Sequence, residues 1–277
     1  MGLYRAHPDD GVAWVTGASS GIGKQIALDL ASAGYTVAVT ARSEQKLTAL
    51  AASADQLGGR IIPFPCDLTD EAATGRTIAA IENTFGPIAL AVLNAGNYFP
   101  TSIDRLDTKS FLNTYEINVF GVVYCLVPLI NRMRERSRGH IVLTGSVSSY
   151  FGLPTTAAYG ATKAALNNMV WSLKHDLDKV NIRIQIVNPG FIDTPLTAKN
   201  SFPMPALMPA DQAAERVIRA IRSGGVEVTF PRRFTWVLKA LGLLPLPVSH
   251  WVINRVTGWN RRPVKRSAVA DARPRRT

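Results

Sequence analysis

Residues 12–23, with the sequence VAWVTGASSGIG, decide the fold of this chain. Five apolar or β-branched residues come first, and glycines follow at positions 17, 21 and 23. Glycine allows a tight turn and lets the backbone approach a pyrophosphate, and the free N–H groups at the start of a following helix attract that anion. A strand-to-helix turn without a ligand could use the same residues. The apolar strand before the turn and the helical pattern after it favour a phosphate-binding turn.

Apolar runs and helical patterns alternate outward from this turn, along residues 11–230. The expected strands are 12–16, 36–40, 61–64, 89–93, 140–144, 183–187 and 226–230. The expected helices lie near 21–33, 43–57, 70–84, 108–136, 157–179 and 210–223. The strands are almost continuously apolar, as strands covered on both faces are. The pattern predicts an α/β fold, a single doubly wound, Rossmann-like parallel sheet of about seven strands with helices on both faces.

Length and charge indicate one domain followed by a basic extension. A chain of 277 residues with 47% hydrophobic and 18% charged residues suits one well-packed domain. Residues 1–230 hold 20 basic and 19 acidic side chains, whereas residues 231–277 hold 11 basic and one acidic side chain. We therefore expect a nucleotide-binding catalytic domain over 1–231 and a basic, apolar extension over 232–277. The last residues, 267–277, should be disordered.

The cysteines and histidines argue against a disulfide framework and against a metal site. Only Cys66 and Cys125 occur, so we expect no disulfide framework and a reducing compartment. The four histidines do not stand at the spacing of metal ligands, so we expect no metal. The N-terminus lacks a signal-peptide pattern, and no uninterrupted apolar run of about 18 residues occurs. These features predict a cytoplasmic protein without a spanning helix.

Further motifs follow the glycine turn in a fixed order. They are Asn94-Ala95-Gly96 after the fourth strand, Asn118 in the next helix, Ser146 after the fifth strand, Tyr159 and Lys163 four residues apart, and Pro189-Gly190 with Thr194 after the sixth strand. With the glycine spacing G-x-x-x-G-x-G in place of G-x-G-x-x-G, they resemble the short-chain dehydrogenase/reductase family over about residues 11–230. The resemblance implies an oxidoreductase that binds a nicotinamide dinucleotide.

The resemblance also implies which residues contact the cofactor. These are the turn residues Gly17, Ser19, Ser20, Gly21, Ile22 and Gly23, the adenine-side residues Asp67 and Leu68, the loop residues Asn94, Ala95 and Gly96, the helical residues Tyr159 and Lys163, and the nicotinamide-side residues Pro189, Gly190, Ile192 and Thr194. As a bare aspartate, Asp67 could equally be the N-cap of the next helix.

The end of the second strand, Thr40-Ala41-Arg42, bears on the choice of nucleotide. Family members that select NAD carry an acid there, which accepts bonds from the ribose hydroxyls. A carboxylate would repel the 2′-phosphate of NADP, whereas a guanidinium can bind it with two charge-assisted hydrogen bonds. A solvated surface arginine is the competing interpretation. We expect Arg42 to select NADP(H).

Tyr159 and Lys163 should share one helix face, because they are four residues apart. Bringing the pKa of a tyrosine from about 10 to about 7 needs roughly 4 kcal/mol, and a neighbouring ammonium and an oxidised nicotinamide supply the right sign. In reduction, Tyr159 would donate its proton to the carbonyl oxygen, and Ser146 would hydrogen-bond that oxygen. By resemblance, Lys163 would also bind the nicotinamide ribose, and Asn118 would hold a water for proton resupply. Taken singly, these residues fit turn, capping and surface roles equally well.

Apolar residues near the presumed substrate predict a hydrophobic or lipid-like carbonyl. We expect the substrate to contact Ser146, Ser148, Tyr150, Phe151 and Phe191. Residues 194–209 contain four prolines and are long for a connection, so they are a candidate lid that includes Phe202, Met204, Leu207 and Met208. The competing interpretation is that most of these side chains only pack the lid.

The extension 232–277 combines apolar and basic residues. The apolar stretch 234–244 is followed by Trp251 and Trp259, and basic residues flank both parts. Tryptophans with flanking basic residues are typical of a helix on an anionic bilayer, which would place the protein at the inner face of a membrane. A helix packed over the active site, an oligomer contact and a docking surface for an acidic carrier protein are alternatives.

These features together predict an NADP(H)-dependent reductase of a hydrophobic ketone, including the 3-oxoacyl type. The alternative from another class is a catalytically silent nucleotide-binding scaffold or sensor at a membrane. Nucleic-acid binding is not expected, because apolar residues outnumber polar ones in the extension and few aromatic residues could stack on bases. By resemblance, the helices near 108–136 and 157–179 would pair across subunits of a homodimer or homotetramer.

Overall fold

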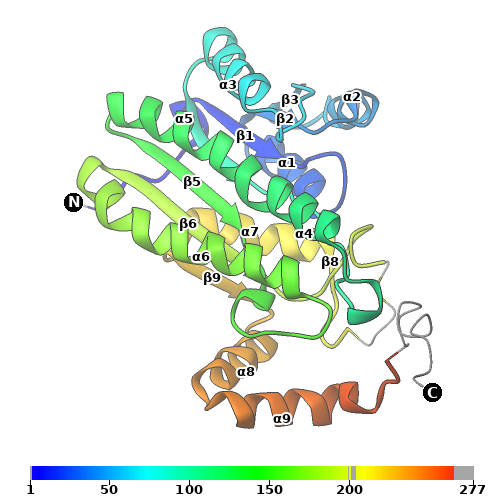
Figure 1. The fold of residues 1–277 in the computed structure, drawn as a ribbon. Coiled ribbons are helices and arrows are strands. Elements are labelled where there is room, and N and C mark those ends of the chain that lie inside the picture. Colours follow the sequence, from blue (N-terminus) through cyan, green and yellow to red (C-terminus); the bar gives the residue numbers. More distant parts are fainter. Residues whose placement is uncertain (1, 199, 201–203, 265–277) are drawn as a thin grey trace, which may run out of the picture.

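The computed structural model describes residues 2–198, 200 and 204–264. A seven-stranded parallel sheet forms its centre, in the order β3-β2-β1-β4-β5-β6-β9 (Figure 1). The strands are β1 Val12–Thr16, β2 Thr36–Thr40, β3 Arg60–Pro63, β4 Ile88–Leu93, β5 Gly139–Thr144, β6 Ile182–Pro189 and β9 Glu227–Phe230. The doubly wound sheet predicted from the sequence is confirmed.

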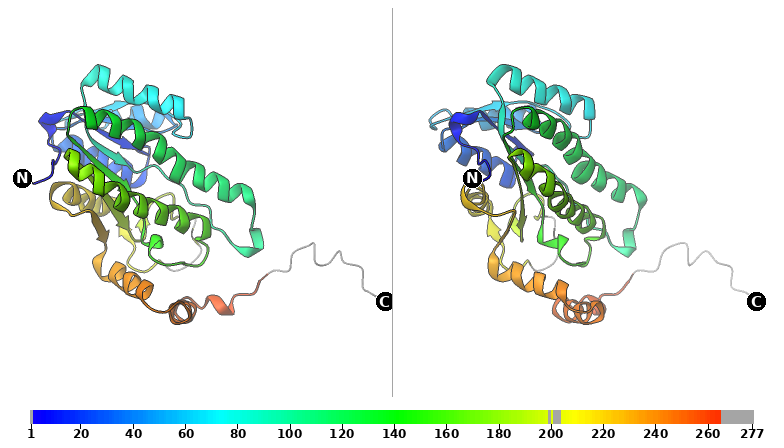
Figure 2. Two further views of the ribbon diagram at one scale, coloured as in Figure 1. Left: turned by 60° about the vertical axis from the view of Figure 1, so that its left-hand side comes forward. Right: turned by 90° about the vertical axis from the view of Figure 1, so that its left-hand side faces the viewer.

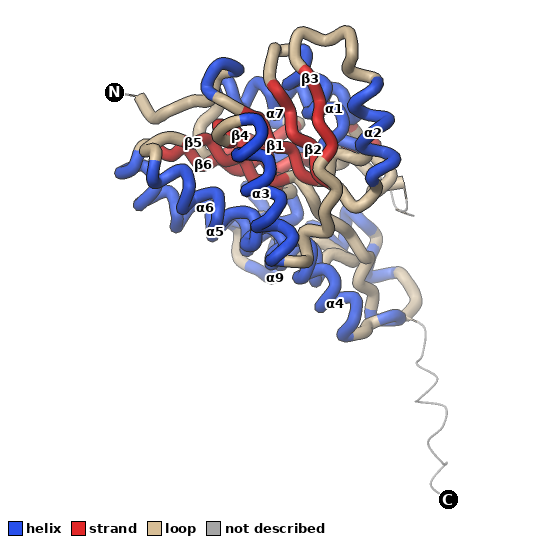
Figure 3. Tube along the Cα trace, turned by 90° about the horizontal axis from the view of Figure 1, so that it is seen from above, coloured by secondary structure: helices blue, strands red, loops and turns tan. Residues whose placement is uncertain are grey.

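Helices cover both faces of the sheet (Figure 3). One layer consists of α1 Gly21–Ser32, α2 Glu44–Ala52 and α7 Ala210–Ser223, and the other of α3 Glu71–Phe85, α5 Gly121–Glu135 and α6 Ala157–Leu177. Successive strand residues point to opposite faces, so Ala13 and Val15 of β1 pack with the first layer while Val12 and Trp14 pack with the second. This two-sided burial explains why the strands are apolar throughout.

The chain adds strands toward one edge of the sheet from β1 and toward the opposite edge from β4, although all strands are parallel. From β1 the chain moves outward to β2 and β3, whereas from β4 it moves the other way, to β5 and β6. Connections on either side of such a reversal diverge, which leaves a crevice at the carboxyl ends of the strands. The ends of β1, β4 and β5 therefore frame the place where a ligand should bind.

The helix predicted over 108–136 is interrupted. α4 Thr108–Tyr115 and α5 are joined by a π-helical turn, η3 Glu116–Phe120, in which the Gly121 N–H donates to the Glu116 carbonyl. Single π turns inside helices occur frequently at functional sites. This turn carries Asn118, one of the predicted catalytic residues.

Within the described residues, the continuous helical stretch Thr108–Glu135 is long and apolar enough to cross a membrane, with a mean hydropathy of 1.3. Length and composition alone do not separate a spanning helix from a core helix. Leu126, Leu129 and Met133 of this stretch are buried against the sheet. These three residues belong to the hydrophobic core on this side of the sheet.

The candidate lid 194–209 is attached to the body at both ends. β7 Ile192–Asp193 pairs in parallel with β8 Met208–Pro209, and the Thr194 carbonyl accepts a bond from the Ala198 N–H at 3.0 Å. The expected lid residue Phe202 lies outside the described residues. Short 3-10 turns complete the fold, at η1 Pro8–Asp10, η2 Ile103–Arg105, η4 Val147–Ser149 and η5 Asp178–Val180.

The extension continues from β9 as two helices. α8 Arg232–Leu243 and α9 Leu246–Thr257 are followed by the short turn η6 Trp259–Arg261. Thr235 and Leu238 of α8 are buried, and both helices lie along one side of the body, beyond the carboxyl ends of β6 and β9 (Figures 1 and 2). The disorder expected for 267–277 falls outside the described residues.

Candidate active site

The glycine turn after β1 is shaped by close backbone contacts. Gly17 has a φ of +67°, and a Cβ built on it would lie 2.8 Å from the Ala95 Cα. Gly21 has a φ of +56° and begins α1, and the preceding Ser20 makes no side-chain bond to the helix N-terminus. The first N–H groups of α1 therefore remain available to an anion.

Gly23 has a different role from the other two glycines. A Cβ at this position would lie 2.5 Å from both the Asn94 Nδ2 and the Gly17 carbonyl oxygen. Gly23 does not line the cavity described below. Its small size lets α1 pack against the turn, so it shapes the cofactor site from behind.

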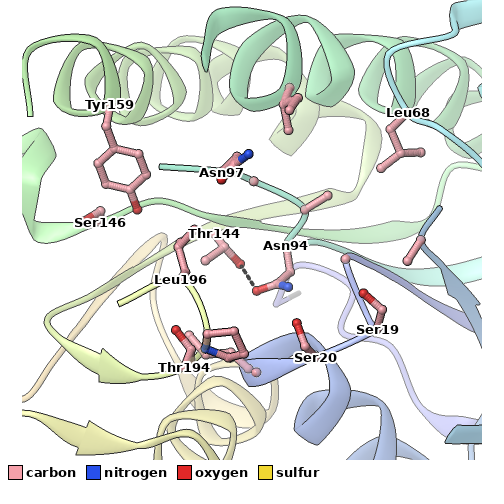
Figure 4. Close-up of a pocket in the computed structure, with 18 of the residues that line it drawn as sticks. Ser19, Ser20, Leu68, Asn94, Asn97, Thr144, Ser146, Tyr159, Thr194 and Leu196 are labelled. Carbon is pink, nitrogen blue, oxygen red and sulfur yellow. Dashed lines mark hydrogen bonds between the residues drawn. The ribbon is translucent and has the colours of Figure 1, made fainter. Parts of the chain in front are cut away.

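Thr16 joins the glycine turn to the Asn94-Ala95-Gly96 loop. Its Oγ1 accepts bonds from the Asn94 N–H at 3.0 Å and the Ala95 N–H at 3.1 Å. The Asn94 side chain donates to the Thr16 carbonyl at 3.3 Å and accepts from the Thr144 Oγ1 at 3.4 Å (Figure 4). The ends of β1, β4 and β5 are thus held in one hydrogen-bonded unit.

A cavity of about 990 Å³ lies over these strand ends. Such a volume is at the upper end of ordinary ligand pockets, as a dinucleotide with a substrate beside it requires. All the predicted cofactor residues except Gly23 line it, namely Gly17, Ser19, Ser20, Gly21, Ile22, Arg42, Asp67, Leu68, Asn94, Ala95, Gly96, Tyr159, Lys163, Pro189, Gly190, Ile192 and Thr194. The positive-φ glycines, the free helix N-terminus and this volume fit a nicotinamide dinucleotide.

Basic and polar groups line one end of the cavity. Arg42 is exposed just after β2, and Lys46 lies in the first turn of α2, whose N-cap Ser43 accepts from the Lys46 N–H at 3.5 Å. Two cations and a helix N-terminus at one place make an anion site. Asp67 accepts from the Thr69 N–H and hydroxyl at 3.1 and 2.9 Å. It is not the N-cap of α3, a role taken by Asp70.

Tyr159 and Lys163 both project from α6 into the cavity. The Lys163 Nζ donates to the Thr144 carbonyl at 2.7 Å and lies 5.6 Å from the centre of the Tyr159 ring. Lys163 is buried, and this burial lowers its pKa to about 8. The ammonium is therefore held at the end of β5 and can lose its proton close to neutral pH.

Burial is the main influence on the pKa of the Tyr159 phenol in the protein alone. It raises this pKa to about 12, the Ser146 hydroxyl acts in the opposite direction, and Tyr98, whose ring centre lies 5.2 Å from that of Tyr159, adds to the rise. The lowered pKa expected from the sequence also depends on the positive charge of an oxidised nicotinamide, so it stays a prediction. Figure 4 shows Ser146 beside the Tyr159 hydroxyl.

Asn118 lies beside the cavity, outside its lining. It is fully buried, its Oδ1 accepts from the Asn97 N–H at 2.7 Å, and its Nδ2 donates to the Asn97 carbonyl at 2.9 Å and the Thr162 hydroxyl at 3.2 Å. A Cβ at Gly96 would lie 3.2 Å from the Asn118 Oδ1 and 3.5 Å from the Lys163 Nζ. Asn118 therefore fixes the loop that separates it from Lys163.

Of the predicted substrate residues, only Ser146 lines the cavity. Ser148 is buried, and its N–H donates to the Ser146 Oγ at 3.2 Å. Tyr150 donates to Glu227, and the Phe151 ring lies 5.6 Å from the His250 ring of α9. Phe191 stacks against Phe234 of α8, with ring centres 5.8 Å apart. These aromatic residues face the helices of the extension, which the sequence pattern could not pair with them.

Several lining residues were not predicted. The main ones are Asn97, Phe99, Asn113, Glu116, Ile117, Thr144, Leu196 and Thr197. Leu196 and Thr197 fall in the segment predicted as a lid. The other residues lie within five positions of a motif residue, before or after it, and nothing in their own pattern marks them.

The described residues contain no group of three or more His, Cys, Asp or Glu side chains arranged to hold a metal ion. Cys125 is buried and Cys66 contributes to the cavity wall, and both are free thiols.

Comparison with known sequences gives a consistent result. Residues 11–203 match the short chain dehydrogenase family. An uncharacterized oxidoreductase from Myxococcus xanthus is 37% identical over 236 residues, covering 85% of this chain and 93% of that protein. A second, from Staphylococcus epidermidis, is 31% identical and covers 76% and 90%.

Two solved structures are similar to this one. An alcohol dehydrogenase from Thermococcus sibiricus, complexed with 5-hydroxy-NADP, has a TM-score of 0.72, 26% identity, and covers 79% of this chain and 95% of that chain. A variant of the actinorhodin polyketide ketoreductase with NADPH has a TM-score of 0.74, 26% identity, and covers 81% and 97%. With the glycine turn, the Tyr159 and Lys163 pair and these matches, the chain belongs to the short-chain dehydrogenase/reductase family of oxidoreductases.

Proposed function

We propose that the protein uses NADP(H) to interconvert a carbonyl group and a secondary alcohol, and that it reduces a hydrophobic ketone, including the 3-oxoacyl type. The observation that carries this proposal is the convergence of Tyr159, Ser146 and Lys163 on one end of a dinucleotide-sized cavity. A phenol and a second hydroxyl can then contact the same carbonyl oxygen.

The choice of NADP(H) is supported by the charge at the other end of the cavity. Arg42 and Lys46 line this end of the cavity, whereas Glu44, the acid that lies between them at the start of α2, does not line it. Both similar structures described above hold an NADP-type cofactor. When bound, NADP(H) supplies or accepts the hydride, and the residues of this chain bind and orient it and move the proton.

The proton for carbonyl reduction comes from Tyr159. Because its pKa is about 12, the phenol is protonated at neutral pH and can act as the acid that reduction needs. The opposite direction needs a phenolate, which must first be stabilised by positive charge. Ser146 donates to the same oxygen and stabilises the charge that develops there.

Lys163 completes the proton path. With a pKa of about 8, it can replace the proton that Tyr159 loses and then recover its own from solvent. Asn118 supports this step through a water, as the family resemblance implies. Its side chain is committed to Asn97 and Thr162, so the main chain of η3 would have to hold that water.

A hydrophobic substrate is supported by the walls near Tyr159. Phe99, Ile117 and Leu196 are apolar lining residues, and Figure 4 places Leu196 on the same side of the cavity as Tyr159 and Ser146. The segment that carries Leu196 is anchored by β7 and β8, so it can cover the substrate without leaving the body. Water exclusion of this kind strengthens the hydrogen bonds to the reacting oxygen.

Assembly as a homodimer or homotetramer is supported by an apolar face on α5 and α6. Val127 and Trp171 are exposed, and a groove of about 890 Å³ runs between the two helices. Pairing of these faces across two copies would bury both side chains. Light scattering of the wild type and of Trp171→Glu tests this, with a monomeric variant as the expected result.

The proposed activity is tested with the full chain and a panel of aliphatic ketones, aromatic ketones and 3-oxoacyl thioesters, following NADPH consumption. We expect turnover of hydrophobic members with NADPH and a lower kcat/KM with NADH. Absence of turnover across the panel, with NADPH bound, would instead support the catalytically silent scaffold.

A further inference from the structure

The helices of the extension expose several large apolar side chains to solvent. Trp236 of α8 is 58% exposed, Trp251 of α9 is 66% exposed, and Leu243 beside the connection between them is 87% exposed. Leu244 in this connection and Leu246 at the start of α9 are also exposed. Large apolar residues gathered in this way mark an interaction site.

The opposite faces of the two helices hold this surface in place. Thr235 and Leu238 of α8 and Ser249 and Ile253 of α9 are buried. The Ser249 hydroxyl donates to the Leu241 carbonyl at 2.7 Å, which links the two helices. Figures 1 and 2 show α8 and α9 together along one side of the body. The exposed side chains therefore belong to a fixed surface.

The charges around the apolar residues all have one sign. Residues 232–264 include six Arg and Lys side chains and no Asp or Glu. Arg232 and Arg233 lie at the start of α8, and Arg255, Arg261 and Arg262 lie at the far end of α9 and beyond it. Basic groups thus flank an apolar centre that carries two tryptophans, the composition of helices that lie in a membrane interface.

We propose that the outer surface of α8 and α9 binds the anionic surface of a lipid bilayer. The leucines and tryptophans enter the headgroup region, and the flanking arginines contact lipid phosphates. A second copy of the chain would fit less well, because it would bring the five arginines of residues 232–264 against the same five, Lys239 being paired with Glu227. Phe191 and Phe151 contact Phe234 of α8 and His250 of α9, so a bound bilayer would lie on the side of the protein that carries these two residues.

Vesicle sedimentation of the full chain tests this surface. We expect binding to vesicles of phosphatidylcholine mixed with phosphatidylglycerol and little binding to phosphatidylcholine alone. Arg255→Ser/Arg261→Ser/Arg262→Ser should bind about 100-fold more weakly at low salt, since each basic residue near the surface contributes several-fold. A matched triple variant on other surfaces, Arg76→Ser/Arg134→Ser/Arg138→Ser, should keep wild-type binding.

The apolar contribution is tested separately. Leu243→Ser should weaken vesicle binding, whereas Leu106→Ser, an exposed leucine on the loop before α4, should not. Equal binding to neutral and anionic vesicles, or no binding by the wild type, would overturn the proposal. So would light scattering that shows a dimer which Leu243→Ser dissociates, because the surface would then be a contact between copies.

A second inference rests on a different observation, a chain of hydrogen bonds from α8 to Ser146. The Ser146 N–H donates to the Asn188 Oδ1 at 2.9 Å, and the Asn188 Nδ2 donates to the Glu227 Oε1 at 3.2 Å. The same carboxylate oxygen accepts from the Tyr150 hydroxyl and from the Lys239 Nζ, the latter at 2.8 Å. Glu227 is thus the common acceptor of three donors.

The groups around Glu227 keep its carboxylate ionised. Asn188 is fully buried, and the Lys239 ammonium lies 4.9 Å over the Tyr150 ring. Although burial acts against it, hydrogen bonds from Lys239 and Tyr150 keep the pKa of Glu227 below its usual range. The carboxylate therefore stays ionised and keeps the Asn188 amide turned so that its carbonyl faces Ser146.

The structure assigns Glu227 and Lys239 as positioning residues for Ser146, an inference that rests on the proposed catalytic role of that serine. Glu227 fixes the orientation of Asn188 together with the Asn167 Oδ1, which accepts from the same Asn188 Nδ2 at 3.1 Å. Asn188 holds the Ser146 backbone, and Glu227 also holds Tyr150, four residues after Ser146. Lys239 neutralises the buried carboxylate. A helix of the extension thereby takes part in setting the catalytic geometry.

Turnover measurements on three variants test this assignment. Glu227→Leu removes the acceptor and should lower kcat about 10- to 100-fold with little change in KM for NADPH. Glu227→Gln keeps an acceptor oxygen and should restore most of the loss. Lys239→Met leaves the carboxylate without its cation, so its pKa should rise and kcat should fall on the acid side of the pH profile.

The outcomes separate this inference from the proposed function. If Ser146→Ala turns over like the wild type, the proposed role of the serine is wrong. If Ser146→Ala is impaired while Glu227→Leu keeps wild-type kcat, the serine role stands and the positioning role is overturned. An unchanged acid limb in Lys239→Met would also count against the part assigned to the lysine.

Discussion

The nucleotide side of the cavity, at the ends of β1, β2 and β4, is built mainly from backbone. The region next to Ser146, at the ends of β5, β6 and β9, is built from side chains that meet across long separations in the chain, most of them outside the cavity lining. Gly17 and Gly21 shape the first side within one short turn. On the second side, Tyr150 reaches Glu227 and Phe151 reaches His250, in another strand and in the extension.

The difference has a physical origin. A pyrophosphate is bound by N–H groups and a helix N-terminus, so its site can be encoded in one contiguous turn. An apolar substrate site has no comparable local element, and its shape depends on which distant segments pack together. Four predictions sharpen this contrast, ordered by the size of the expected effect.

The largest effect should come from Tyr159, where the two sides meet. Tyr159→Phe removes the proton donor and should lower kcat by about 10³-fold, within the range for general acid catalysis. NADPH affinity, measured by fluorescence titration, should stay within about twofold, because the nucleotide side is built from backbone. Retention of wild-type turnover by a folded variant would contradict the assigned role.

The pH dependence of stability tests how strongly the Lys163 ammonium is buried. The unfolded lysine titrates near 10.5 and the folded one near 8, so between these pH values the unfolded chain binds more protons. The free energy of unfolding should therefore rise from pH 8 to 10.5, by about 3 kcal/mol more in the wild type than in Lys163→Met. Parallel pH dependence of the two proteins in urea denaturation would show that the lysine is solvated.

Arg42 tests the one side chain on which the nucleotide preference depends. Arg42→Asp removes a charged contact and adds repulsion, so KM for NADPH should rise about 30-fold while KM for NADH falls or stays the same. Lys24→Asp changes the charge of a nearby residue that does not line the cavity and serves as the control. Equal KM changes for both cofactors would remove the support for NADP selection.

Phe191 should give the smallest effect and tests the substrate side directly. Because its ring stacks on Phe234 of α8, Phe191→Ala should lower the free energy of unfolding by about 1–2 kcal/mol and leave KM for the ketone nearly unchanged. Thermal unfolding and ketone kinetics on one preparation measure both quantities. A large rise in KM at wild-type stability would show that Phe191 contacts substrate, as the sequence pattern suggested.

Features that depend on neighbouring residues could be predicted from the sequence, whereas features that depend on distant residues could not. The seven strands and the motif residues from Gly17 to Thr194 could be located because each depends on a few neighbouring residues. The interruption of 108–136 by a π turn could not be seen, since Asn118 acquires its position through Asn97 and Thr162, which are distant in sequence. The partners of Tyr150 and Phe191 were missed for the same reason.

The ion pair between Lys239 and Glu227 carries a consequence for the inheritance of the extension. A relative that lost α8 would keep a carboxylate in a half-buried place without its cation, a costly arrangement. Loss of the helix and replacement of the acid should therefore occur together. Homologues that end shortly after β9 should carry a neutral residue at the position of Glu227, so the two features would pass between lineages as one unit.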